Sequence, residues 1–259
     1  MKKTVLFIGV SCLLFALTSC NKDEPKQGKA EVKILLTDDP ADYDAVYVDI
    51  QGIEIHSDAE GWISPALIGP GVYNLLDLSN GLDTLLVDAA LPAGNLSQMR
   101  LLLGPKNSVV VEGIVYPLST PSAQQSGLKF NIHQNLDAGG SYKIWIDFDA
   151  ARSIVEMGTG NYSLKPVIRA YTELTDGRLK GFVLPFAADP VVYAIMGTDT
   201  AITIPDSNGF FLFSGLPEAT YHVWMDGSEA AGFDDVHLDS VQVNFGAITD
   251  LGSTTLPPL

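Results

Sequence analysis

Apolar and polar residues alternate along most of the chain from residue 30 onward. Val32, Ile34 and Leu36 begin this pattern, and the segment 142–148 repeats it with its even-numbered residues apolar. A period of two is the pattern of a strand that buries one face. Glycine and proline separate the alternating segments at short intervals, as turns do. The strands expected in the first half are 32–36, 46–55, 73–78, 96–103, 109–118, 128–132 and 142–148.

Two details modify this pattern. Apolar residues occupy even positions up to Ile50 and odd positions from Ile53 onward, with Gly52 between them. Such a switch predicts a β-bulge, because one extra residue returns the following side chains to the same face. Residues 83–90 form the one segment of this half in which we expect a short helix.

The second half continues the pattern, with strands expected at 179–184, 191–196, 201–204, 210–213, 221–225 and 241–245. Asp206-Ser207-Asn208-Gly209 predicts a tight hairpin turn, because Asn-Gly accepts positive φ. Many short strands separated by turns predict an all-β fold. We expect two consecutive antiparallel β-sandwich domains, at 30–173 and 176–259.

The N-terminus has the pattern of an export signal. Lys2 and Lys3 precede an apolar run over residues 4–17, which is too short to span a membrane. Residues 1–19 are therefore expected to be a signal peptide that is removed. Because Cys12 leaves with it, Cys20 is the single thiol of the mature chain, as expected if that thiol carries lipid.

Leu17-Thr18-Ser19-Cys20 resembles the bacterial lipobox. The resemblance implies a lipoprotein held on a membrane by acyl chains on Cys20. Residues 20–29 are expected to be a flexible acidic tether. Within it, Lys22-Asp23-Glu24 resembles the surface-export signal of certain Gram-negative lipoproteins. This implies a lipid anchor in the outer membrane with the chain facing the outside of the cell.

The charge of the chain restricts its partners. The formal net charge of −16 becomes −18 once Lys2 and Lys3 are removed. Such a surface repels nucleic acid, so no nucleic-acid partner is expected.

Acidic residues form the main candidate site. Six aspartates are concentrated in one loop and on one strand face, at Asp38, Asp39, Asp42, Asp44, Asp147 and Asp149. Three interpretations remain open. The aspartates cap turns or pair with Arg100, Arg152 or Arg169; they bind calcium; or Asp147 and Asp149 serve as the carboxyl pair of a glycosidase.

Other candidate residues carry weaker signals. Trp145 lies on the same strand face as Asp147. Packing in the core or against a second sheet is the favoured interpretation, and stacking of its ring on a sugar is the alternative. The four histidines are isolated in the sequence, so no zinc site is expected. They are His56, His133, His222 and His237. No cofactor is expected apart from the possible calcium.

Two further resemblances cover the sandwiches. Leu36-Thr37-Asp38 and the segments 43–48, 122–129, 147–150 and 164–169 resemble a family of uncharacterised domains of bacterial surface lipoproteins. That family has no established activity. Residues 206–213, with Leu216-Pro217 and Thr220-Tyr221, resemble the carboxypeptidase regulatory-like domain. This implies a transthyretin-like sandwich that acts as a spacer or binding accessory.

These observations predict a cell-surface lipoprotein that acts as a non-catalytic binding or structural module. It would be adhesin-like, glycan-associated or an accessory of an envelope assembly. Its expected partners are the membrane, through the lipid anchor, and a glycan or an envelope or matrix protein. Two alternatives remain: a hydrolase of extracellular polysaccharide that uses Asp147 and Asp149, and a calcium-stabilised binding protein.

Overall fold

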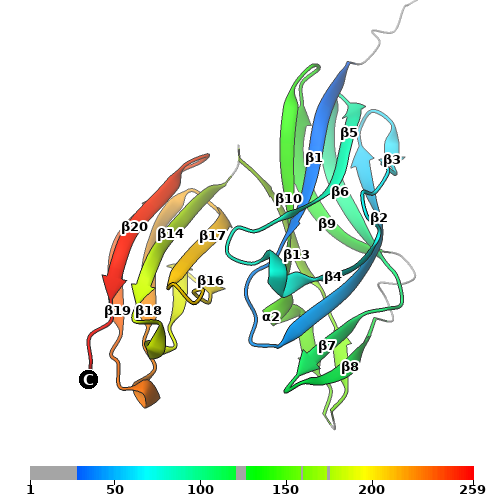
Figure 1. Ribbon diagram of the computed structural model, residues 1–259. Coiled ribbons are helices and arrows are strands. Elements are labelled where there is room, and N and C mark those ends of the chain that lie inside the picture. The colour runs from blue at the N-terminus through cyan, green and yellow to red at the C-terminus, as the bar shows by residue number, and fades with distance from the viewer. Residues whose placement is uncertain (1–27, 121–126, 159, 174–175) are drawn as a thin grey trace, which may run out of the picture.

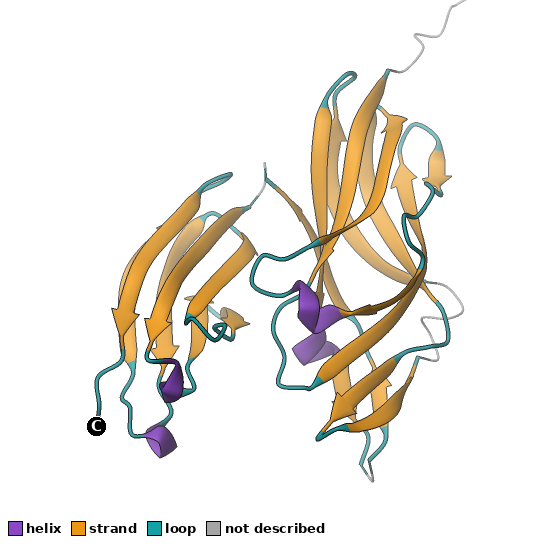
Figure 2. Ribbon diagram, viewed as in Figure 1, coloured by secondary structure: helices purple, strands orange, loops and turns teal. Residues whose placement is uncertain are grey.

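The computed structural model describes residues 28–120, 127–158, 160–173 and 176–259. Strands make up nearly all of this part of the chain, and its helices are short (Figure 2). The prediction of an all-β fold is confirmed. In the described residues, no helix is long and apolar enough to cross a membrane.

The first sandwich (residues 29–172) contains thirteen strands and two short helical turns. They are β1 (Lys29–Thr37), β2 (Ala45–Ser57), β3 (Gly61–Ile63), β4 (Gly71–Asn74), η1 (Leu75–Leu78), β5 (Thr84–Pro92), β6 (Gly94–Leu103), β7 (Ser108–Val111), β8 (Ile114–Ser119), β9 (Leu128–Leu136), β10 (Ser141–Asp149), α2 (Ala150–Ser153), β11 (Ile154–Glu156), β12 (Tyr162–Leu164) and β13 (Val167–Thr172). One sheet has the order β13-β10-β1-β5. The other runs β11-β12-β8-β7-β2-β6-β9, and β3 and β4 also pair with β2.

Alternation along these strands builds the first core. Val32, Ile34 and Leu36 of β1 are fully buried, as are Ile144 and Ile146 of β10. They belong to one apolar cluster that also takes in the inward residues of β2 and β6. The opposite face of β1 and β10 is therefore free to carry polar groups.

The predicted bulge at Gly52 is confirmed. The pairing of β2 with β6 shifts register between Ile50 and Gly52. Ile50, Ile53 and Ile55 are all buried. The extra residue thus keeps one face of β2 inward on both sides of the bulge.

The second sandwich (residues 177–255) contains seven strands in two sheets (Figure 1). Its elements are β14 (Gly177–Leu184), η2 (Phe186–Ala188), β15 (Val191–Met196), β16 (Asp199–Thr203), β17 (Phe210–Leu216), β18 (Ala219–Asp226), η3 (Glu229–Ala231), β19 (Val236–Val243) and β20 (Ile248–Thr255). One sheet has the order β17-β14-β20 and the other β16-β15-β18-β19. A separate apolar cluster, with Phe211, Phe213 and Met225 among its members, fills this sandwich.

The structure departs from the expected antiparallel sheets at three strand pairs. β1 pairs with β10, β8 with β12, and β14 with β20 in parallel. Each pair joins strands far apart in sequence, because parallel neighbours need a long connection. Alternation within a strand carries no information about the direction of its neighbour.

Two local predictions are wrong. Residues 83–90 are not helical, since most of them belong to β5, which pairs with β1 and buries Leu86 and Val87. Asp206-Ser207-Asn208-Gly209 is a turn but not a hairpin turn, because it joins β16 and β17, which lie in different sheets. The Asp206 carboxylate closes this turn by accepting hydrogen bonds from two backbone N–H groups, those of Asn208 and Phe210.

Candidate functional site at the interface of the two sandwiches

The predicted site residues on β10 lie on the outer face of the smaller sheet of the first sandwich. Trp145 is opposite Tyr171 of β13, and Asp147 is opposite Arg169. Alternate residues of a strand share a face, so these four side chains form two adjacent rows. This face is turned toward the second sandwich, where β13 approaches β17 (Figure 1).

Arg169 links the acidic residues of the first sandwich to the second. Its Nε donates to Asp147 Oδ2 at 2.5 Å, and its Nη2 lies 3.3 Å from Asp39 Oδ2. The same Nη2 donates to the carbonyl oxygen of Ser214 on β17, also at 3.3 Å. The flanking carboxylates hold the pKa of Arg169 above its ordinary value, although burial opposes them. The guanidinium is thus the permanent cation of the site.

Burial raises the pKa of the surrounding carboxyl groups. The pKa of Asp38 rises to about 9, although a hydrogen bond from the Ala150 N–H opposes the shift. The pKa of Asp39 rises to about 8, chiefly through burial and the nearby Asp147 carboxylate. Burial also raises the pKa of Asp147, while Arg169 counteracts it. The protonated form is therefore favoured most strongly at Asp38, whereas the ion pair with Arg169 favours the charged form of Asp39.

Two carboxyl oxygens of this cluster lack partners. Asp38 is 4% exposed and Asp147 is 2% exposed. Asp38 Oδ2 and Asp147 Oδ1 have no hydrogen-bond partner among the described residues. An unpaired buried carboxylate oxygen is costly, and protonation is the least expensive remedy. The cluster therefore contains buried carboxyl groups with raised pKa values, next to the arginine Arg169.

The other predicted aspartates have local roles. Asp149 Oδ1 caps α2 by accepting from the Arg152 N–H at 2.8 Å. Asp44 Oδ2 accepts from the Gly113 N–H at 2.7 Å, in the turn between β7 and β8. Asp42 lies in the loop between β1 and β2. Four of the six aspartates thus come together, since Asp38, Asp39, Asp147 and Asp149 interact electrostatically.

Of the three interpretations of the aspartates, pairing and capping describe what the structure contains. Arg169 and Arg152 both pair with members of the cluster, whereas Arg100 pairs with Glu54 and lies over the Trp62 ring. Within the described ranges, no group of three or more His, Cys, Asp or Glu side chains is arranged to hold a metal ion. Calcium binding stays a prediction.

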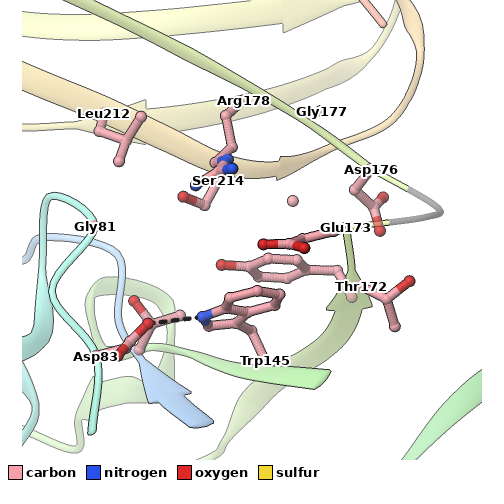
Figure 3. A pocket seen from close by; sticks show the side chains of 13 residues that line it. Gly81, Asp83, Trp145, Thr172, Glu173, Asp176, Gly177, Arg178, Leu212 and Ser214 are labelled. Carbon is pink, nitrogen blue, oxygen red and sulfur yellow. Dashed lines mark hydrogen bonds between the residues drawn. The ribbon is translucent and has the colours of Figure 1, made fainter. Parts of the chain in front are cut away.

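Trp145 borders a small pocket between the sandwiches (Figure 3). Its indole Nε1 donates to Asp83 Oδ2 at 2.8 Å, and its ring lies parallel to that of Tyr171 with centroids 5.6 Å apart. The pocket volume is about 60 Å³. Ligand sites occupy roughly 300–1,000 Å³, so this pocket has room for water and not for a sugar ring.

A larger cleft of about 620 Å³ lies on the other side of Arg169. Its walls come from both sandwiches: Asp39, Pro40, Asp149, Ala151, Arg152, Val167, Ile168 and Arg169 from the first, and Ala194, Met196, Thr198, Asp199, Thr200, Ala201, Ile202, Leu216, Pro217 and Tyr221 from the second. This volume falls within the range of ligand sites.

The cleft runs along an edge strand. β16 ends the sheet β16-β15-β18-β19, and no described strand pairs with its outer edge. A two-residue loop joins Met196 to Asp199, which makes them the hydrogen-bonded closing pair of the hairpin. By alternation, the N–H and C=O groups of Thr200 and Ile202 lie on the outer edge of β16, and both residues border the cleft. The sequence contained no signal for this edge, because strand order is a tertiary property.

Polar and steric contacts hold the sandwiches together. Asn80 Nδ2 donates to the Ile204 carbonyl at 3.1 Å, and the Thr203 hydroxyl donates to Asn80 Oδ1 at 3.3 Å. Gly215 of β17 lies against the Tyr171 ring so closely that a Cβ there would come within 2.6 Å of it. These contacts join the two sandwiches that supply the walls of the cleft.

The remaining predicted residues, Cys20, Lys22, Asp23 and Glu24, lie outside the described residues. The lipid anchor and the export signal stay predictions.

The fold and the site define a class: a double β-sandwich protein with a partly buried arginine–carboxylate cluster at its interface. The family model described as "Domain of unknown function (DUF4382)" matches residues 29–166, more than half of the chain. The chain belongs to this family. No curated protein matches it.

Solved structures give distant likenesses. The Bacillus anthracis TIE protein is 12% identical, with a TM-score of 0.24, over 88% of this chain and 34% of that one. A streptococcal ancillary pilin is 14% identical, with a TM-score of 0.22, over 89% and 63%. The fimbrial anchor protein Mfa2 from Porphyromonas gingivalis is 10% identical, with a TM-score of 0.24, over 87% and 90%. The chain thus spans less than two thirds of the first two proteins, and likenesses this low carry no argument.

Proposed function

We propose that this chain is a cell-surface lipoprotein whose two sandwiches form a rigid, non-catalytic binding or structural module. The observation that carries the proposal is the ion pair between Asp147 and Arg169, at the interface with the second sandwich. The strand face with the best candidate for catalysis serves to hold the two sandwiches together.

The geometry argues against the hydrolase alternative. A glycosidase needs two carboxyl groups that flank an accessible glycosidic bond. Asp147 is 2% exposed and bound to Arg169, whereas Asp149 caps a helix. Asp149 borders the 620 Å³ cleft, but the buried Asp147 cannot serve as the second carboxyl group of a catalytic pair.

The 620 Å³ cleft supports a binding role. Its floor includes apolar side chains of β15 and β17, and its wall includes the free edge of β16. An extended polypeptide segment matches both features, because its backbone completes the hydrogen bonds of the edge and its alternate side chains meet the apolar floor. We therefore favour a protein partner over a glycan.

The lipid anchor completes the proposal. Cys20 would hold the chain on the outer membrane, and residues 20–29 would separate the sandwiches from the lipid surface. The second sandwich has seven strands in two sheets, an arrangement that supports a transthyretin-like spacer or binding accessory.

The anchor is tested by replacing its thiol. We expect Cys20→Ser to abolish the incorporation of a clickable palmitate analogue and to release the chain from the outer-membrane fraction, because acyl chains supply the membrane affinity. Protease shaving of intact cells should degrade the wild-type chain on the outer face. Palmitate labelling that persists in Cys20→Ser would contradict the assignment of this cysteine.

The binding role is tested with the detergent-solubilised chain, which is screened against envelope proteins, matrix proteins and glycans. We expect a protein ligand whose binding is weakened at least about tenfold by Thr200→Pro, because proline removes an edge N–H group. Hydrolysis of any extracellular polysaccharide that Asp147→Asn with Asp149→Asn abolishes would overturn the proposal. The proposal would also be overturned if the wild-type chain, shown to be folded by its melting temperature, bound none of the protein probes.

A further inference from the structure

A β-bulge lies in the last strand pair of the larger sheet of the second sandwich. Tyr221 of β18 is opposite Val241 of β19, and Val223 is opposite Leu238. Two residues of β19, Asp239 and Ser240, therefore lie opposite the single residue His222 on β18. Bulges of this kind redirect side chains.

The bulge contains a strained residue. Ser240 has a φ of 61°, in the left-handed region that residues other than glycine seldom adopt. Strain of this kind persists where the surrounding structure requires it, and it occurs often at functional sites. One local effect of the bulge is that the Asp239 side chain of β19 lies against His222 of β18.

Three side chains form a chain of contacts across the two strands. Asp239 Oδ1 lies 2.6 Å from His222 Nδ1, and His222 Nε2 lies 3.1 Å from His237 Nδ1. If His222 Nδ1 carries the proton and donates a hydrogen bond to Asp239 Oδ1, the Nε2 lone pair of that ring points toward His237. Two imidazole nitrogens then face each other on the outer face of the sheet.

Neighbouring aromatic rings hold His237 in place. The centroids of the His237 and Trp224 rings are 5.9 Å apart, and the angle between the ring planes is 14°. Trp224 stacks in turn on Tyr193, with ring centroids 4.6 Å apart. Its indole Nε1 donates to Asp235 Oδ2 at 2.9 Å. These contacts limit the orientations that the His237 ring can adopt.

We propose that His222 Nε2 and His237 Nδ1 bind a divalent transition metal ion, such as Zn²⁺ or Cu²⁺, on the outer face of this sheet. Histidine nitrogens bind zinc at about 2.0–2.1 Å, so two nitrogens 3.1 Å apart subtend about 98° at the metal. That angle lies between the square-planar and tetrahedral values, both of which these ions accept. Small rotations of the two rings aim their lone pairs at a common point.

Asp239 acts as the outer partner of the metal site. A carboxylate on the second nitrogen of a ligating histidine fixes its tautomer and makes it a better ligand. No third protein ligand is in place in the described part of the chain, so water completes the coordination. Asp239 is 84% exposed on its side chain and has room to change rotamer.

The test is isothermal titration of the detergent-solubilised full-length chain with Zn²⁺ and with Cu²⁺. We expect one ion per chain and a loss of affinity of at least about tenfold in His222→Gln and in His237→Gln. Asp239→Asn should weaken binding by about 10–100-fold, as outer-shell changes do. His133→Gln, on the exposed face of β9, is the matched control and should bind as the wild type does.

A second readout reports the location of the ion. Cu²⁺ should quench the fluorescence of the wild-type chain, and Trp224→Phe should remove most of that quenching because Trp224 adjoins His237. Unchanged binding in the double variant His222→Gln/His237→Gln would place the ion elsewhere and overturn the proposal. The absence of binding to the wild type would leave the histidine pair with a strand-pairing role alone, and it would also overturn the proposal.

Discussion

At the scale of single residues, the cluster at the interface contains more carboxyl groups than cationic side chains that could pair with them. Asp39 and Asp147 both pair with Arg169, and burial raises the pKa of Asp38 to about 9 and that of Asp39 to about 8. Removing the arginine from such a cluster would leave a buried charge uncompensated, which costs about 3–5 kcal/mol. Protonation lets the remaining carboxyl groups stay inside.

This cluster predicts an unusual dependence of stability on pH. The ordinary pKa of Asp38 is 3.8, and its pKa in the folded chain is about 9, so between these values the folded chain holds a proton that the unfolded chain has lost. The free energy of unfolding therefore falls as the pH rises through this window. We expect urea unfolding to show a lower stability at pH 9 than at pH 5.

Asp38→Asn provides the control. The amide keeps the acceptor for the Ala150 N–H and cannot ionise, so the variant should lose less stability between pH 5 and pH 9. At pH 9 it should exceed the wild type by at least about 1 kcal/mol, since a shift of one pKa unit corresponds to about 1.4 kcal/mol. Identical pH profiles for the two chains would refute the assignment of Asp38 as a buried acid.

At the scale of elements, two turns flank the edge strand β16 and differ in their surroundings. Gly197, before it, has a φ of 61° and open space where a Cβ would lie. Gly209, after it, has a φ of 80°, and a Cβ would come within 2.3 Å of the Val183 carbonyl oxygen. The second turn carries the chain from one sheet to the other, and it packs against Val183 and Leu184 of β14.

The pair predicts a graded effect of the same substitution. Gly197→Ala should cost about 1–2 kcal/mol, because only the left-handed conformation opposes it. Gly209→Ala should cost at least about 1 kcal/mol more, because the backbone of β14 must also move. Chemical denaturation of both variants measures the difference, and equal losses would show that the turn is looser than described.

At the scale of the whole molecule, the interface makes one body of two sandwiches. Arg169 bonds to Ser214, Asn80 bonds across to β16 and the residue after it, and Gly215 admits the Tyr171 ring. The walls of the cleft come from both sides of this interface. A module that binds in the cleft therefore depends on the docking of its two parts.

Gly215→Ala tests this docking. The methyl group would collide with the Tyr171 ring, so we expect calorimetry to resolve two unfolding transitions in place of one. Gly252→Ala is the control, because Gly252 has a φ of 68°, close to the 70° of Gly215, and faces open space. Two transitions in the wild type would show that the interface is too weak to couple the sandwiches.

Much of the fold follows from local pattern. The all-β class, most of the strands and the bulge at Gly52 were predictable because alternation and turn chemistry act between near neighbours in sequence. The helix expected at 83–90 was wrong because its residues gain more as β5, paired with β1. The pairing of Arg169 and Arg152 with aspartates was one of three open interpretations.

The sequence by itself determined which segments form strands and turns, and it predicts a signal peptide that ends at a lipobox. Only the tertiary structure decided which segments meet. It paired Asp147 with Arg169 at the interface with the second sandwich. It also placed the free edge of β16 beside a cleft and brought His222 into contact with His237 next to a bulge. The physical reason is that strand order and register are set by the burial of whole faces, which depends on partners far away in the chain.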